Sequence, residues 1–65
     1  MNQVTNIPTG HGELRIWESA AGVWAWATPN GSQGSAEDSF EEAVSAAFHA
    51  EELDPSDYGY KDFSA

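Results

Sequence analysis

Apolar and polar positions alternate with a period of two along residues 13–27. In "ELRIWES", Leu14 and Ile16 alternate with Arg15 and Trp17, and in the next segment, "VWAWAT", valine and alanines alternate with two tryptophans. A period of two is typical of strands that bury one face. The pattern therefore predicts two half-buried strands joined by the short turn "AAG".

The length of this turn decides which side chains face the core. A two-residue turn at Ala21-Gly22 puts all three tryptophans of the hairpin on the outer face. A three-residue turn that includes Ala20 puts Trp24 and Trp26 in the core with the aliphatic residues of the first strand. We favour the longer turn, because the core of so small a domain needs large side chains.

The segments around this hairpin carry turn signals. Residues 1–12 contain Pro8, Gly10 and Gly12 among polar residues, which indicates a flexible lead-in. After the hairpin, "PNGS" predicts a turn, because proline fixes φ and Asn-Gly tolerates left-handed conformations. A third, short strand can follow near residues 32–35. We therefore expect residues 13–35 to form a β-hairpin or a three-stranded meander.

Residues 36–53 carry the pattern of an amphipathic helix. At 100° per residue, one face holds the apolar residues Phe40, Val44, Ala47 and Phe48. The opposite face holds the polar residues Glu41, Glu42, Ser45, His49 and Glu52. "SFEE" has the form of a capping box that starts at Ser39, and Ser35 offers a rival start one turn earlier.

The helix is expected to end before Asp54-Pro55, since the residue before proline avoids the helical region. The same pair predicts a short helical turn before Gly59, within a tail of residues 54–65. Residues 1–65 then form one small acidic domain. Its predicted fold is α+β, with a two- to three-stranded antiparallel sheet packed against one amphipathic helix in two layers.

Composition limits the classes of protein that this chain can belong to. It has 65 residues and no cysteine, so its core is thin and neither a disulfide nor a cysteine-based zinc site supports it. No signal peptide and no apolar run of membrane-spanning length is visible, so we expect a soluble protein of the cytoplasm. With 40% hydrophobic residues, the chain is too apolar to be a disordered acidic tail.

Charge is the strongest functional signal in the sequence. The net charge is -9, which excludes nucleic acid and anionic membranes as direct partners, because both are bound through Lys and Arg. Residues 35–57 hold eight acids and no Lys or Arg. We take these acids as the candidate partner-binding residues: Glu37, Asp38, Glu41, Glu42, Glu51, Glu52, Asp54 and Asp57.

The spacing of these acids resembles the spacing of phosphates. From Glu37 to Glu52, six carboxylates would lie on about 24 Å of helix, or one for roughly every 4 Å. One DNA strand carries a phosphate about every 3.4 Å. The sequence therefore predicts a non-enzymatic inhibitor that imitates nucleic acid and binds the basic site of a nucleic-acid-binding protein.

No other motif carries chemistry. His11 and His49 stand without a cysteine, a serine motif or HExxH spacing, so we expect no enzyme and assign no catalytic residue. "DPSDYGYKD" departs from the calcium loop of EF-hands, because the loop-ending glutamate is missing. We expect no metal and no cofactor.

The tryptophans support an alternative function. If they lie on an exposed sheet face, the chain is a small protein-interaction or dimerisation module whose acidity serves solubility. The secondary partner-binding residues under this hypothesis are Trp17, Trp24 and Trp26.

A resemblance to a known class of proteins, in size, charge and order of elements, is carried by two segments, "GELRIWESAAGVWAWATPNG" and "EDSFEEAVSAAFHAEELD". In these respects the whole chain resembles small acidic phage-encoded anti-CRISPR proteins, similar to inhibitors of type I-C systems. The resemblance implies a Cas effector as partner, namely the large subunit of the DNA-surveillance complex, in the cytoplasm of the host cell. We expect the chain to act as a monomer.

Overall fold

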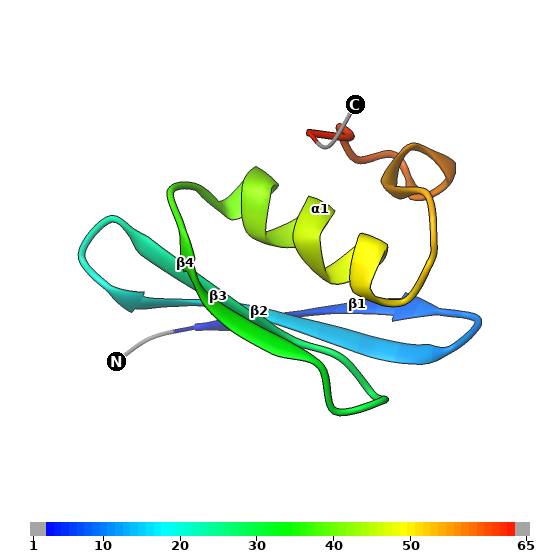
Figure 1. Ribbon diagram of the computed structural model, residues 1–65, viewed down its shortest axis with the longest axis horizontal. Helices are drawn as coiled ribbons and strands as arrows, with labels where there is room; N and C mark the ends of the chain where they lie inside the picture. The colour runs from blue at the N-terminus through cyan, green and yellow to red at the C-terminus, as the bar shows by residue number, and fades with distance from the viewer. Residues whose placement is uncertain (1–2, 64–65) are drawn as a thin grey trace.

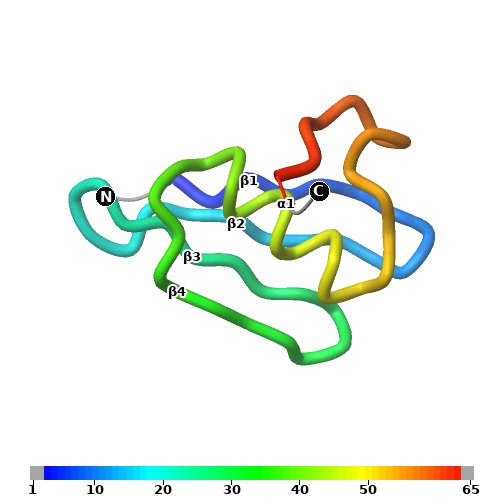
Figure 2. Tube along the Cα trace, turned by 45° about the horizontal axis from the view of Figure 1, so that its top comes forward, coloured from blue at the N-terminus to red at the C-terminus, as the bar shows by residue number. Residues whose placement is uncertain are grey.

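The chain folds into two layers, an antiparallel sheet and one helix that lies across one face of it (Figure 1). The computed structural model describes residues 3–63. Its elements are β1 (Val4–Thr9), β2 (Gly12–Ala20), β3 (Val23–Ala27), β4 (Gln33–Glu37), α1 (Phe40–Ala50) and a short 3-10 helix η1 (Pro55–Tyr58). The sheet order is β1-β2-β3-β4, and Figure 2 shows the four strands side by side. The predicted α+β class is confirmed.

The sheet has four strands, where the sequence predicted two or three. The additional strand is β1, which pairs with β2 from Val4 opposite Trp17 to Thr9 opposite Gly12. The expectation of a flexible lead-in was therefore wrong for this segment. Pro8 is compatible with β1 because β1 lies at the edge of the sheet, where one side of the strand needs no ladder donors. Residues 1–2 and 64–65, at the ends of the expected lead-in and tail, lie outside the described residues.

The turn between β2 and β3 is the two-residue turn Ala21-Gly22, because Ala20 pairs with Val23. Gly22 has a φ of 75°, which a glycine adopts without strain. The favoured three-residue turn was therefore wrong.

The tryptophans of β3 nevertheless lie on the core side of the sheet, as we favoured. The register shifts between Glu18 and Ala20, and beyond this irregularity Trp26 pairs with Ile16. Paired residues point to the same side of a sheet, so Trp24 and Trp26 lie on the side of Ile16 and α1. Both pack against the core cluster.

β4 passes close to the ring of Trp26 through a glycine. A Cβ atom at Gly34 would lie 2.8 Å from Trp26 Nε1 and 2.9 Å from two ring carbons. A larger residue at this position would have to displace the indole. Strand β4 extends to Glu37, two residues beyond the predicted segment.

Helix α1 starts where the capping box predicted. The Ser39 side chain accepts a hydrogen bond from the backbone N–H of Glu42 at 3.1 Å, so the rival start at Ser35 was wrong. The helix covers 11 residues and is shorter than the predicted 36–53. After it, Asp54 caps η1 and Pro55 takes the first helical position, as predicted.

The core lies between α1 and the sheet. Its buried residues are Ile7, Leu14, Ile16, Ala43, Val44, Ala47 and Phe48. The Phe48 ring also contacts the C-terminal segment, with ring centroids 5.0 Å from Tyr58 and 5.9 Å from Tyr60. Ser45, predicted on the polar face, is buried, and its hydroxyl accepts from the Phe63 N–H at 3.0 Å.

Candidate functional site: exposed acids and one buried carboxylate

The exposed and half-buried acids of the candidate site form two groups, one at each end of α1. The N-terminal acidic group comprises Glu37, Asp38, Glu41 and Glu42. The C-terminal acidic group comprises Glu52, Asp54 and Asp57. The 11 residues of α1 separate the groups by about 16 Å. The expected continuous rod of carboxylates on one helix is therefore wrong, since only two of the six acids lie within α1.

The helix dipole of α1 stabilises part of the N-terminal acidic group. Glu41 and Glu42 lie in the first turn of α1, where the partial positive charge of the helix dipole favours carboxylates. Glu37 ends β4 and Asp38 follows it, so both immediately precede the Ser39 cap. The chain therefore concentrates four acids around one helix end that tolerates them.

The C-terminal acidic group lies on the segment that follows α1. Asp54 accepts hydrogen bonds from the backbone N–H of Ser56 at 2.9 Å and from its hydroxyl at 2.7 Å, which fixes the start of η1. Glu52, which precedes Asp54, and Asp57, which lies within η1, are both exposed. Glu52 has a φ of 59°, so the chain turns sharply as it leaves the helix.

Neither of the chain's two cationic side chains neutralises these acids. Within residues 3–63, the ion pairs involve histidines only: His11 with Glu51 at 3.1 Å, and His49 with Asp62 at 2.8 Å. Lys61 lies over the Phe63 ring, 5.0 Å from its centroid. The two acidic groups therefore keep their negative charge available to a partner.

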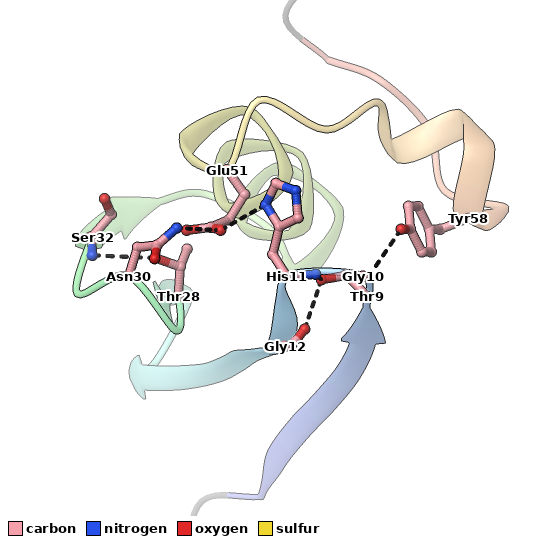
Figure 3. Close-up of polar contacts among 9 residues, drawn as sticks. All are labelled: Thr9, Gly10, His11, Gly12, Thr28, Asn30, Ser32, Glu51 and Tyr58. Carbon is pink, nitrogen blue, oxygen red and sulfur yellow. Dashed lines mark hydrogen bonds and ion pairs between the residues drawn. The ribbon is translucent and has the colours of Figure 1, made fainter.

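Glu51 does not belong to this exposed surface. It is 3% exposed, and its carboxylate lies between the two turns that carry Asn30 and His11 (Figure 3). Its Oε1 accepts from Asn30 Nδ2 at 2.7 Å and lies 3.1 Å from His11 Nδ1. A carboxylate accepts hydrogen bonds, so Nδ1 of His11 carries the proton. Glu51 was predicted to bind a partner, and its burial contradicts that role.

The buried carboxylate joins three segments that are distant in the sequence. His11 belongs to the turn between β1 and β2, Asn30 belongs to the turn between β3 and β4, and Glu51 caps the C-terminus of α1. Near this cluster, the Gly10 N–H lies 3.5 Å from the hydroxyl oxygen of Tyr58 (Figure 3). Glu51 therefore holds the end of the helix, and with it the C-terminal acidic group, against the sheet.

Two opposing effects set the pKa of Glu51. Burial raises the pKa, because it disfavours the charged form, whereas hydrogen bonds from Thr28, His11 and Asn30 and the charge of His11 lower it. The net result is a pKa below the ordinary value of 4.5. The folded protein therefore favours the ionised carboxylate.

We expect this carboxylate to stabilise the fold in a pH-dependent way. A lowered pKa contributes stability that is complete above the unfolded pKa, near 4.5, and is lost as the pH falls through the folded pKa. The Glu51→Gln variant should be less stable than wild type at neutral pH, with a difference that shrinks as the medium is acidified below pH 4.5. Urea unfolding of both proteins over a pH series measures this difference. A difference that stays constant down to the lowest pH would contradict the assignment.

The structure separates the three tryptophans of the alternative site. Trp24 and Trp26 lie on the side of α1, and Trp24 meets the Phe40 ring edge-on with centroids 5.6 Å apart. Trp17 pairs with Ala25 and points to the other face of the sheet. A common tryptophan surface on the outer face, as the alternative required, is therefore not formed.

Sequence periodicity contains a signal that identifies Glu51 as buried. Glu51 follows Phe48 by three positions and Ala47 by four, so a helical projection places it on the apolar face. His11 and Asn30, which complete the cluster, carry no such signal, because they lie in turns far from Glu51 in the sequence.

No three His, Asp or Glu side chains of residues 3–63 gather closely enough to hold a metal ion. In the same range, no helix has the length and apolar character needed to cross a membrane. Comparison of the chain with protein-family models, curated proteins and solved structures found no match.

Proposed function

We propose that the chain is a non-enzymatic inhibitor that presents a nucleic-acid-like acidic surface to the basic site of a nucleic-acid-binding protein. One observation carries this proposal. Seven accessible or partly accessible carboxylates lie at the two ends of α1, and within residues 3–63 none of them has a lysine or arginine partner. At the C-terminal end of α1 such charge is locally unfavourable, because the helix dipole disfavours carboxylates there, and unfavourable arrangements are expected where a function requires them.

The two acidic groups can replace phosphates in a basic groove. Carboxylates recruit the same Lys and Arg side chains as phosphates do, and binding releases counterions in the same way. Their separation of about 16 Å is comparable to the width of the DNA major groove, about 12 Å. The inhibitor then occupies the positions of phosphates on both sides of a groove rather than along one strand.

The resemblance to small acidic anti-CRISPR proteins suggests the target. Under this proposal the basic site belongs to a Cas effector, the large subunit of a type I-C DNA-surveillance complex, in the cytoplasm of the host cell. That subunit recognises the short motif beside the target sequence. The bound inhibitor excludes target DNA from it.

Competition for DNA tests the proposal. The purified chain is titrated into a purified type I-C surveillance complex that holds fluorescently labelled target DNA. We expect it to displace the DNA completely, with equal final signal whether inhibitor or DNA is added first. The inhibitor itself should not bind the labelled DNA.

Unimpaired DNA binding at saturating inhibitor would contradict the proposed target. The same titration with an unrelated basic DNA-binding protein serves as a control for nonspecific charge attraction. Displacement that is as strong from this control protein would contradict specificity for the surveillance complex.

A further inference from the structure

The sheet face opposite α1 carries a set of side chains that no helix or strand within residues 3–63 covers. The register places these residues on one side, because paired residues point the same way and neighbours along a strand alternate. We call this set the open face: Val4, Asn6, Pro8, Glu13, Arg15, Trp17, Ala20, Val23, Ala25, Ala27 and Gln33. Figure 1 shows α1 and η1 on the other side of the sheet.

The centre of the open face is apolar. Val4 is 50% exposed, which is high for a large aliphatic side chain. Trp17 is half-buried and pairs with Val4 on one side and Ala25 on the other. Ala25 is only 1% exposed although no element crosses it, so neighbouring side chains close over it.

Two shallow hollows lie beside Trp17. The first, of about 340 Å³, is lined by Trp17, Trp26, Gln33, Gly34 and Ser35. The second, of about 310 Å³, is lined by Val4, Arg15, Trp17, Ala27 and Gln33. Trp17 belongs to both, so this aromatic side chain lies between two depressions. A two-fold interface needs this kind of self-complementary surface, in which a side chain of each copy enters a hollow of the other.

Charge on the open face also favours a second copy of the chain. All eleven Asp and Glu residues lie within residues 3–63. Of these, only Glu13 occupies a strand position on the open face, and the positive charge of Arg15 on the same face balances it. The face is therefore close to neutral, although the chain carries a net charge of -9. Two such acidic chains repel each other least when they approach through this face.

Glu13 and Arg15 provide a complementary pair for such an approach. They lie two positions apart on β2, about 6.8 Å along one face of the strand. Their charges cancel on this face, so a second copy that approaches through it meets no net charge. A charge reversal at either residue alone removes this balance, whereas exchange of the two residues keeps it.

From these features we infer that the open face is a weak homodimer interface. The four strands have 6, 9, 5 and 5 residues, and at a spacing of about 4.8 Å they offer about 400 Å² per copy, hence about 800 Å² in total, which fits a weak, transient contact. The chain is therefore a monomer when dilute and a dimer when concentrated. Both acidic groups stay outside the contact, so this inference does not depend on the proposed function.

Sedimentation velocity from micromolar to millimolar concentration tests the inference. We expect wild type to shift from monomer to dimer over this range. Val4→Arg, which puts an unpaired charge into the open face, should weaken dimerisation at least about tenfold. Thr5→Arg is the matched control, because exposed Thr5 pairs with Ile16 and points to the other side of the sheet. It should dimerise like wild type.

Charge variants of β2 give a second, independent readout. Arg15→Glu should dimerise less than wild type, and the exchanged pair Glu13→Arg with Arg15→Glu should restore dimerisation. Added salt should strengthen the dimer, because it screens the repulsion between two chains of charge -9. Wild type that stays monomeric at millimolar concentration and high salt would overturn the inference. Equal dimerisation of wild type, Val4→Arg and Arg15→Glu would also overturn it.

Discussion

The double variant Glu41→Lys/Glu42→Lys is expected to lose the ability to displace target DNA from the surveillance complex. Both side chains lie in the first turn of α1, at the centre of the N-terminal acidic group. The change puts two cations where the basic groove expects anions, and like charges brought together at an interface cost several kcal/mol. We expect the concentration needed for half displacement to rise at least about 100-fold.

Two control variants separate this loss of binding from damage to the fold. Glu41→Gln/Glu42→Gln removes the charges without placing cations at the helix N-terminus, and it should lose less displacement activity than the lysine variant. Glu13→Lys reverses one charge on the other side of the sheet, outside both acidic groups, and should retain displacement. Circular dichroism checks the fold of each. Full activity of a folded Glu41→Lys/Glu42→Lys variant would contradict the acidic-surface proposal.

Phe48→Ala is expected to unfold much of the protein at physiological temperature. Phe48 is 0% exposed, packs in the core cluster and contacts the Tyr58 and Tyr60 rings. Truncating a buried phenylalanine costs about 3–5 kcal/mol. A domain of this size has a total free energy of unfolding of about 3–10 kcal/mol, so the loss is a large part of it.

Phe63→Ala is the matched control for this prediction, because Phe63 is 42% exposed. It should cost less than about 1 kcal/mol, as surface substitutions away from the core commonly do. Thermal and urea unfolding followed by circular dichroism measure both variants. Equal unfolding free energies for Phe48→Ala and wild type would contradict the placement of Phe48 at the centre of the core.

Features that depend on neighbouring residues could be predicted from the sequence. The Ser39 cap, the alternation of β2 and the Asp54-Pro55 start of η1 are each decided within a few residues by backbone preferences and side-chain hydrogen bonds. All three appear in the structure as predicted. The overall α+β arrangement follows, because one amphipathic helix must cover one face of the sheet.

Features that depend on distant pairing could not be predicted. β1 carries Pro8 and one buried residue, Ile7, so its sequence does not alternate like a strand and only pairing with β2 holds it. The hairpin register is set by side-chain contacts around its bulge, where the Gly22 N–H donates to Glu18 Oε2 at 2.8 Å and the Ser19 hydroxyl donates to the Val23 carbonyl at 3.3 Å. Turn length alone does not reveal such contacts.

The candidate site also combines features that the sequence predicts with features that depend on distant parts of the chain. The excess of acids between residues 35 and 57 was visible in the sequence, but their separation into two groups depends on where α1 starts and ends. Glu51 and Glu52 are neighbours of identical chemistry, yet one is buried between two turns and the other is exposed. The difference arises from partners that approach from other parts of the chain.

The salt dependence of DNA displacement is the most direct test of the central claim, that the acidic groups bind a basic nucleic-acid site. The affinity of the chain for the surveillance complex is measured over a series of salt concentrations, for wild type and for Glu41→Gln/Glu42→Gln. We predict that the logarithm of the affinity falls linearly with the logarithm of the salt concentration, and that the variant has a shallower slope. An affinity that does not change with salt, with equal slopes for both proteins, would contradict the claim.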